Sequence, residues 1–227
     1  AIYYFSYSIL IRLILFIGKM SLFMIYKRYK KKNFKEFNKI WNINFMNSIT
    51  GFKPANLIGT ISKDNIDNLG IFSSVLHLGS NPALLGFTLR PQDIKKTDTY
   101  KNITENLFYT INSVGKNFFN QSHLTSKKYH EEISEFERLN IDKYNTKNFN
   151  APFVKDSQIK IGLKKVEEHL LYNKCILMVG KIEQIIIDED IIEEDGNINF
   201  DKSDILCLSG LNSYYKPKLL KKLKYVK

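Results

Sequence analysis

The chain has 227 residues, which is enough for one domain with a sizeable core, and its formal net charge is +11 at pH 7. This charge lies at the ends: residues 1–35 carry eight Lys or Arg and no acid, residues 216–227 carry six Lys and no acid, and residues 36–215 have a net charge of −3. A nucleic-acid-binding domain normally carries positive charge as a patch on its folded body, so we expect no nucleic-acid partner for the central domain.

The N-terminal residues 1–26 are strongly apolar and are followed by the basic run of residues 27–32. A membrane anchor or signal is one interpretation, but Arg12 would lie near the middle of the span, where a charge is costly. The other interpretation, which we favour, is that residues 1–19 are translated upstream sequence and that Met20 is the natural start. We therefore separate an N-terminal segment, residues 1–33, from the domain and expect a membrane partner only if residues 1–26 are native.

The remaining residues, 34–227, predict one mainly β domain without repeats or a Pro/Gly/Ser-rich linker. Residues 51–62 are predicted as a turn followed by a strand. The other predicted strands are residues 68–78, 83–89, 108–113, 158–169 and 174–188, with a short strand at residues 198–200; the predicted helices are residues 34–47, 98–107, 116–124 and 130–139. Many strands and few helices are typical of an antiparallel barrel. In the first helix, Trp41 is either a ligand-stacking residue or, as we favour, a core or interface residue.

Two features between residues 68 and 99 can hold a ligand. Ser73 and Ser74, at adjacent positions of a predicted strand, would point to opposite faces, so only one side chain could reach a given ligand. Arg90, Lys96 and Thr99 flank the start of the predicted helix 98–107, capped by Thr97 or Asp98, where positive charge and free backbone amides favour a phosphate. Without a ligand, the first feature is a pair of ordinary strand hydroxyls and the second is a solvated cationic loop.

Other chemistries are not indicated. Cys175 and Cys207 are far apart and form no Cys-x-x-Cys motif, which predicts reduced thiols in a cytoplasmic protein. The histidines lack metal-ligand spacing, and the acidic residues 188–195 do not match a calcium loop. The chain also contains no Gly-x-Gly-x-x-Gly, phosphate-loop or Gly-x-Ser-x-Gly motif. We therefore expect no metal site, no separate dinucleotide-binding domain and no serine hydrolase site.

Several short motifs occur in a characteristic order along the chain. They are Asn68-x-x-x-Phe72-Ser73-Ser74, Ser80-Asn81-Pro82, Arg90, Thr99-x-x-Asn102-Ile103, Phe108-x-x-x-Asn112, His123-x-Thr125-Ser126, Ile133-Ser134-Glu135-Phe136-Glu137, Ala151-Pro152 and Ser209-Gly210-Leu211-x-Ser213-Tyr214. No single motif is specific, but their combined order and spacing from about residue 47 to residue 227 resemble the flavin reductase-like, FMN-binding split-barrel family. The chain departs from that pattern by one extra residue between Arg90 and Thr99.

The resemblance implies a split antiparallel β-barrel that forms a homodimer, with one FMN near each subunit contact. NADH or NADPH would reduce the flavin, which would pass electrons to free flavin or another acceptor. Members bind the flavin along the strand with Ser73 and Ser74, so the implied cofactor-binding residues are Asn68, Phe72, Ser73, Ser74, Val75, Arg90, Lys96 and Thr99. His123 either faces the nicotinamide or substrate as a catalytic residue, or is a helix-end histidine paired to the backbone.

Two other functions stay open at this point. One is an FMN-binding electron carrier without its own NAD(P)H reaction, which the bleaching of bound flavin by NADH would distinguish from a reductase. The other is a non-enzymatic basic protein that binds nucleic acid or a membrane through its charged ends. A colourless protein that takes up no FMN would favour this last function.

Overall fold

The structure is a computed structural model that describes residues 26–226. The chain forms two compact units, residues 1–42 and 43–227. The first contains α2 (Lys31–Phe34), and α3 (Lys39–Ser48) crosses the boundary. Trp41 packs against Phe37, with ring centroids 4.2 Å apart. The predictions for residues 1–25 lie outside the described residues, and no helix within residues 26–226 is long and apolar enough to cross a membrane.

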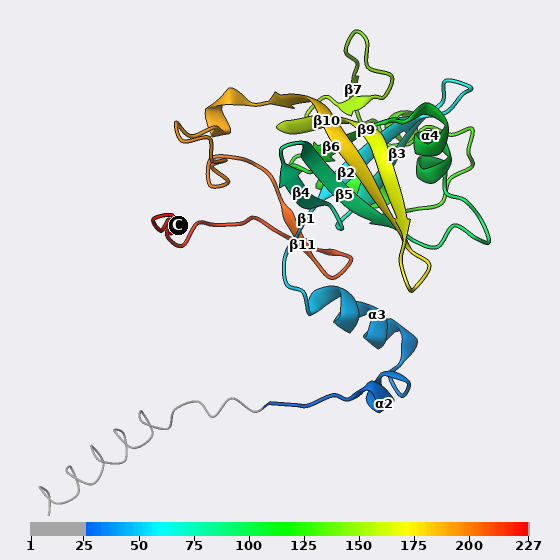
Figure 1. Cartoon of the computed structure of the whole chain (residues 1–227), viewed down its shortest axis with the longest axis vertical. Coiled ribbons are helices and arrows are strands. Elements are labelled where there is room, and N and C mark those ends of the chain that lie inside the picture. The colour runs from blue at the N-terminus through cyan, green and yellow to red at the C-terminus, as the bar shows by residue number, and fades with distance from the viewer. Residues whose placement is uncertain (1–25, 227) are drawn as a thin grey trace, which may run out of the picture. The chain divides into compact units, whose positions relative to one another are not determined.

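A seven-stranded antiparallel sheet forms the body of the second unit (Figure 1). Its strands are β2 (Asn56–Ile61), β3 (Asp67–Phe72), β4 (Leu76–Ser80), β5 (Ala83–Leu89), β6 (Phe108–Ser113), β9 (Ile159–Leu170) and β10 (Ile176–Ile187). The spatial order is β3-β2-β6-β9-β10-β5-β4. Because the edge strands β3 and β4 follow one another in the chain, the link of residues 73–75 joins the two edges and closes the sheet into a barrel. The predicted mainly β, antiparallel fold is confirmed.

The prediction of one strand over residues 68–78 is wrong, because the strand ends at Phe72 and a new one begins at Leu76. The Ser74 hydroxyl donates to the Thr88 carbonyl oxygen at 3.2 Å and accepts from the Thr88 amide at 3.1 Å. The Ser74 side chain thus makes the hydrogen bonds with Thr88 that the backbone of a neighbouring strand would otherwise make. Before this point the chain pairs with β2, and after it the chain pairs with β5. Ser73 and Ser74 are therefore not adjacent positions of one strand.

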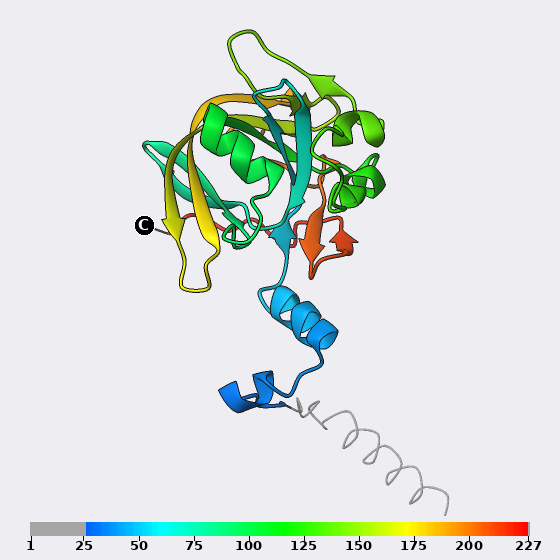
Figure 2. The same cartoon turned by 90° about the vertical axis from the view of Figure 1, so that its right-hand side faces the viewer.

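Shorter elements surround the barrel. They are the three-stranded sheet of β1 (Lys53–Pro54), β11 (Cys207–Ser209) and β12 (Ser213–Tyr215), the pair β7 (Lys143–Tyr144) and β8 (Phe153–Val154), the helices α4 (Asp98–Asn106), α5 (Phe119–Leu124) and α6 (Glu135–Arg138), and the 3₁₀ turn η1 (Glu189–Ile191). The predicted strand at residues 198–200 is not formed; Ile198 makes only an isolated bridge with Ile192. Helix α4 lies against the barrel between the β9–β10 hairpin and β3 (Figure 2).

The core has two parts because both faces of β2 are buried. Ile58 packs inside the barrel with Phe87 and Met178, whereas its neighbour Leu57 packs outside with Leu69 and residues of α5 and α6. Successive side chains of a strand point to opposite faces, so one apolar strand can serve both clusters. The outer cluster attaches the helices to the β3 edge, where residues of the predicted site lie.

Candidate functional site

Helix α4 begins at a loop, residues 90–97, that internal hydrogen bonds hold in place. Thr97 has extended backbone dihedrals, and its hydroxyl accepts from the Tyr100 amide at 3.4 Å, so of the two predicted N-cap candidates Thr97 is the cap and Asp98 is the first helical residue. The buried Gln92 accepts from the Thr97 amide at 2.8 Å and donates to the Arg90 carbonyl oxygen at 2.6 Å. Because the first amides of a helix have no intrahelical acceptor, this end of α4 presents donors and the positive end of the helix dipole.

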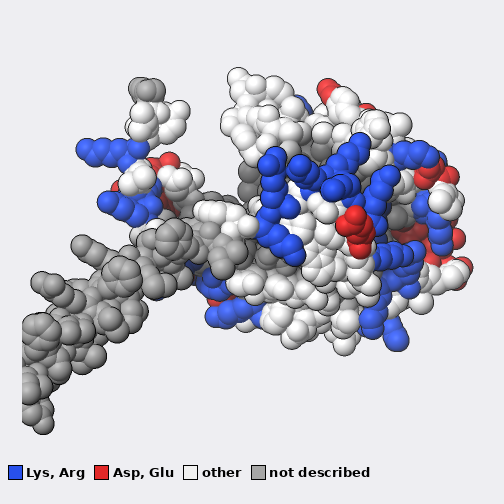
Figure 3. Space-filling view, turned by 90° about the horizontal axis from the view of Figure 1, so that it is seen from below, with Lys and Arg blue, Asp and Glu red and all other residues white. Residues whose placement is uncertain are grey.

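The cationic side chains of the predicted phosphate seat lie on this loop. Arg90 is exposed and follows Thr88 by two residues, so it lies at the same end of β5 as the Ser74 contact. Lys96 lies over the Tyr100 ring, with its Nζ 5.8 Å from the ring centroid. Figure 3 shows Lys and Arg side chains spread over the face of the barrel that is seen from below. In Figure 1, this loop and the β9–β10 hairpin point towards that lower end of the barrel.

Thr99 and Asn68 belong to a polar network between α4 and the barrel. The buried Thr99 hydroxyl donates to Asn68 Oδ1 at 3.1 Å, and the Thr60 hydroxyl donates to the same oxygen at 3.2 Å. Asn102 Nδ2 in turn donates to Thr60 Oγ1 at 3.1 Å. The Thr99 hydroxyl is thus already paired inside the protein, and its backbone amide is the group placed at the start of the helix.

Glu135 on α6 completes this network, although sequence analysis assigned no role to it beyond its place in a motif. Its side chain is 6% exposed, and Oε2 accepts from Asn68 Nδ2 at 3.1 Å and from the Leu69 amide at 2.9 Å. Burial raises the pKa of this carboxyl, although the two hydrogen bonds act in the opposite direction. Glu135 therefore fixes the orientation of Asn68, and Asn68 fixes that of Thr99.

A second contact holds α4 from the side of the β9–β10 hairpin. The Tyr100 hydroxyl donates to Glu168 Oε1 at 3.1 Å, and Lys165 Nζ lies 2.5 Å from Glu168 Oε2. Burial and the charge of Glu168 raise the pKa of Tyr100, whereas the Lys165 hydrogen bond lowers the pKa of Glu168. The start of α4 is consequently held from both sides of the barrel.

The remaining predicted flavin-binding residues lie around the β3–β4 link: some pack into the core and the others belong to the link itself. Phe72 packs edge-on against Phe87, with ring centroids 5.2 Å apart, and Val75 also packs against the interior cluster. Ser73 is half-buried and is the residue at which the chain leaves β3. Phe72 and Val75 therefore support the link from inside, and Ser73 and the backbone of residues 73–75 are left to face a ligand.

His123 lies on α5, which packs against β3. Its Nδ1 is 3.0 Å from the Tyr214 hydroxyl, and burial raises the pKa of Tyr214 to about 12. The ring of His123 thus pairs with a side chain and not with the backbone. A histidine and a tyrosine at this distance share a hydrogen bond along which a proton can be held or passed.

The chain matches known proteins of one family. The family model described as "Flavin reductase like domain" matches residues 52–204. A proposed flavin reductase with a split barrel domain from Shewanella frigidimarina NCIMB 400 is 36% identical with a TM-score of 0.84, over 88% of this chain and 100% of that chain. A relative from Aquifex aeolicus (strain VF5) is 25% identical over 151 residues, 66% of this chain and 76% of its own.

A more distant structure shows the same fold. The flavoredoxin of Desulfovibrio vulgaris (Miyazaki F) is 23% identical with a TM-score of 0.65, over 76% of this chain and 91% of that chain. The family model covers more than half of the chain, and the barrel closes through the β3–β4 link, so the resemblance drawn from the motifs is confirmed. The chain belongs to the flavin reductase-like family and has its split-barrel fold.

Proposed function

We propose that this protein binds FMN and acts as an NAD(P)H-dependent oxidoreductase that passes electrons to free flavin or another acceptor. The observation that carries the proposal is the anchored cationic loop at the start of α4, in a chain of the flavin reductase-like family. A flavoredoxin and an FMN-binding protein from Thermus thermophilus share the fold, which supports a flavin as the ligand. The family resemblance and the free cysteines also favour a cytoplasmic location.

The residues present fit a flavin mononucleotide. Arg90, Lys96 and the first amides of α4 supply the charge and the donors that a phosphate needs. Ser73 and the backbone of the β3–β4 link offer polar groups to the ring system, as the resemblance implies. When bound, the isoalloxazine supplies the redox chemistry, so the protein's task is to bind, orient and shield it. His123, with Tyr214, is the candidate for contact with nicotinamide or substrate.

The phosphate seat can be tested by comparing FMN with riboflavin, which lacks the phosphate. Arg90→Ala and Lys96→Ala are each expected to weaken FMN about 10- to 100-fold, the range for losing a hydrogen bond to a charged group, and to leave riboflavin nearly unchanged. Rising salt should weaken FMN more in the wild type than in these variants. Flavin-fluorescence titration measures both ligands, and Lys95→Ala, which removes the same charge from the same loop, is the matched control.

Equal losses for the two flavins would mean that the substitutions disturb the barrel. No loss for either flavin would move the phosphate away from this loop, towards the β3–β4 link.

The oxidoreductase activity is tested by mixing the FMN-loaded protein with NADH or NADPH in a stopped-flow spectrometer without oxygen. We expect bleaching of the flavin absorbance with one of the two nucleotides at a rate that saturates with its concentration. Retained flavin that neither nucleotide bleaches would favour the electron carrier instead. His123→Gln should slow the bleaching if this residue faces the nicotinamide and should leave FMN affinity unchanged.

We further propose a homodimer in which the subunit contact lies near the flavin. The exposed apolar residues Ile94, Leu170 and Tyr172 lie on the cationic loop and at the β9–β10 hairpin tip, and the ion pair between Asp93 and Lys174, 3.0 Å long, joins these two segments. Such a patch is typical of a subunit contact.

Light scattering should therefore report a dimer that loses FMN as it dissociates. Tyr172→Glu should shift it towards the monomer, whereas Tyr225→Glu, which changes another exposed tyrosine, should not. A stable monomer that retains FMN would contradict this assembly.

A further inference from the structure

Residues 216–226, which we call the lysine-rich segment, form neither helix nor strand (Figure 1). The segment contains no acidic residue and five lysines, Lys216, Lys218, Lys221, Lys222 and Lys224. Its large apolar side chains are exposed to solvent. The exposed fractions are 62% for Leu219, 100% for Leu220 and 76% for Leu223. Several exposed apolar side chains so close together are typical of a contact surface.

The order of these residues has the period of an α-helix, although the segment is not helical in the structure. Leu219, Leu223 and Val226 are spaced by four and three residues, so they would line one face of a helix, with Leu220 at its edge. The lysines would lie on the other sides. A helix this short is marginal in water unless its apolar face is covered. The helical pattern, which the fold itself does not use, therefore indicates that the segment folds on an external surface.

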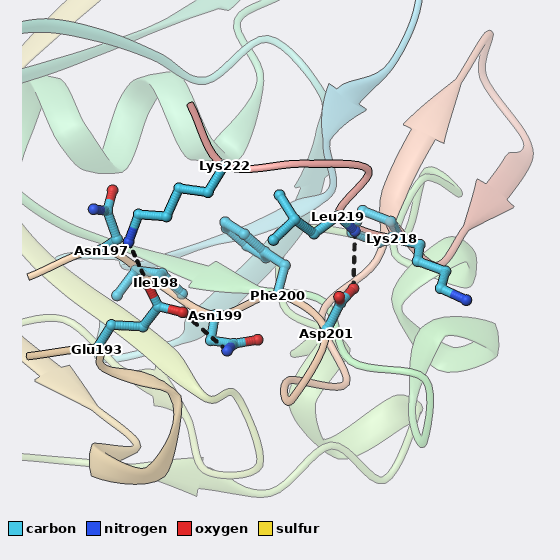
Figure 4. A pocket seen from close by; sticks show the side chains of 10 residues that line it. Glu193, Asn197, Ile198, Asn199, Phe200, Asp201, Lys218, Leu219 and Lys222 are labelled. Carbon is cyan, nitrogen blue, oxygen red and sulfur yellow. Dashed lines mark hydrogen bonds and ion pairs between the residues drawn. The ribbon is translucent and has the colours of Figure 1, made fainter. Parts of the chain in front are cut away.

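Two exchangeable contacts hold the segment next to an acidic turn. Lys222 Nζ lies 2.7 Å from Glu193 Oε2 and 2.6 Å from Asp195 Oδ2. The Leu219 amide donates to Asp201 Oδ1 at 3.0 Å, beside a pocket of about 270 Å³ (Figure 4). Exposed ion pairs contribute little to stability and weaken with salt. The segment can therefore exchange these acids for another anionic surface.

The other lysines of the segment decide which surface fits. Lys216 Nζ donates to the Phe200 carbonyl oxygen at 2.6 Å, which fixes the start of the segment. Within the part of the chain that the structure describes, Lys218, Lys221 and Lys224 make no ion pair. Free positive charges around an apolar stripe fit a surface that is anionic outside and apolar beneath, as in a membrane with anionic lipids. Nucleic acid offers the charge but no apolar layer for the leucines.

We propose that the lysine-rich segment binds the surface of a membrane that contains anionic lipids, as a short helix with its leucines in the apolar layer and its lysines among the headgroups. The membrane partner expected from the sequence rested on residues 1–26, whereas this contact uses different residues. A helix of this length spans about 16 Å, roughly half of the apolar layer, so it lies in the surface and does not cross it. None of the residues that hold the segment belongs to the phosphate seat, so the contact is independent of FMN.

The test measures co-sedimentation of the full-length protein with phosphatidylcholine vesicles, with and without anionic phosphatidylglycerol. We expect saturable binding to the anionic vesicles that weakens with salt, and at least about 10-fold weaker binding to the neutral ones. Lys218→Gln with Lys224→Gln should weaken binding about 10-fold or more, since each lysine near such a surface contributes about 5-fold. Lys127→Gln with Lys128→Gln, which removes two other exposed lysines, is the matched control and should change affinity by less than about 2-fold.

A rearranged segment separates the helical pattern from composition and charge. Exchanging residue 218 with 219 and residue 223 with 224 keeps every residue type but spreads the leucines around the helix. The substitutions are Lys218→Leu, Leu219→Lys, Leu223→Lys and Lys224→Leu. This protein should bind anionic vesicles at least about 10-fold more weakly than the wild type. Equal affinity would show that charge alone drives the contact and would overturn the proposal.

Two tryptophan variants report which side of the segment enters the lipid. In a Trp41→Phe background, Leu223→Trp and Lys221→Trp place the fluorophore on opposite sides of a helix but on the same side of an extended chain. We expect vesicles with brominated lipids to quench the tryptophan at position 223 at least about 3-fold more than the one at position 221. Equal quenching would contradict the helix.

Other partners give different results. If anionic vesicles bind no better than neutral ones, the proposal is wrong, and binding of a DNA duplex would then identify nucleic acid as the partner. A changed oligomeric state of the rearranged protein in light scattering would show that a second copy of the chain covers the leucines, which would also overturn it. The rearranged protein should bind FMN as the wild type does. Failure of both proteins to bind FMN would affect only the flavin proposal.

Discussion

Glu135→Ala is expected to lower the free energy of unfolding by about 2–4 kcal/mol at pH 7, because it leaves two buried donors without an acceptor. These donors are the Leu69 amide and Asn68 Nδ2, which lie 2.9 and 3.1 Å from Glu135 Oε2. The loss should also weaken FMN, since Asn68 would no longer be held in the orientation in which it accepts from Thr99. Urea unfolding of the flavin-free protein and FMN titration separate the two effects.

Glu135→Gln is the matched control, because the amide oxygen can accept both hydrogen bonds without burying a charge. The pKa of Glu135 is raised in the folded protein, so its favourable contribution to stability is fully present below the unfolded value of about 4.3 and is lost as the pH rises through the folded value. Relative to the wild type, the Gln protein should therefore gain stability as the pH rises through that interval and should level off above it. A Gln protein as unstable as the Ala protein would show that the network requires the carboxylate charge itself.

Gly180→Ala is expected to cost about 3 kcal/mol or more, because a methyl group at this position of β10 would overlap the Tyr109 side chain. The added carbon would lie 2.8 Å from Tyr109 Cζ, with the hydroxyl oxygen closer still. Tyr109 is fully buried in the core cluster inside the barrel, and because protein cores are closely packed, its ring cannot move without displacing its neighbours. Gly79→Ala, whose nearest neighbour would be 3.5 Å away, is the control and should change stability by less than about 1 kcal/mol.

The contact between Gly180 and Tyr109 leads to a further prediction, that Tyr109→Phe stabilises the protein by about 1–2 kcal/mol. The Tyr109 hydroxyl is buried without a hydrogen-bond partner, and burial raises its pKa, so its removal relieves an unmet desolvation cost. In the Tyr109→Phe background, Gly180→Ala should cost less, since the nearest atom is gone. A double-mutant cycle by urea unfolding measures this coupling. An equal cost in both backgrounds would mean that the Gly180 methyl conflicts with something other than the tyrosine.

Local patterns predicted much of the barrel. The strand at residues 108–113 and the long hairpin of residues 158–188 were predicted from apolar runs bounded by turn residues, and the start of α4 from its capping threonine. The break after Phe72 could not be predicted, because residues 68–78 are continuously apolar enough for one strand. Its cause is the contact of Ser74 with Thr88, fourteen residues further along the chain.

In the candidate site, too, some features could be predicted from the sequence and others could not. The position of Arg90 and Lys96 next to a helix start could be predicted, because charge and a helix start are visible in the sequence, and their role as phosphate ligands stays a prediction. The contacts of Gln92 with Thr97 and of Glu135 with Asn68 could not, since each depends on how a loop or a distant helix folds back; Glu135 reaches a residue 67 positions away. The signal for Glu135 in the sequence was its place in the motif Ile133-Ser134-Glu135-Phe136-Glu137.

The most direct test of the central claim, that this chain is a flavin-binding member of its family, is the absorbance spectrum of the purified full-length protein after incubation with FMN and removal of the excess by gel filtration. The account predicts a yellow protein with flavin absorbance bands and a single FMN per chain, and chromatography of the released cofactor should identify FMN. A colourless protein that retains no FMN at any concentration would contradict the account.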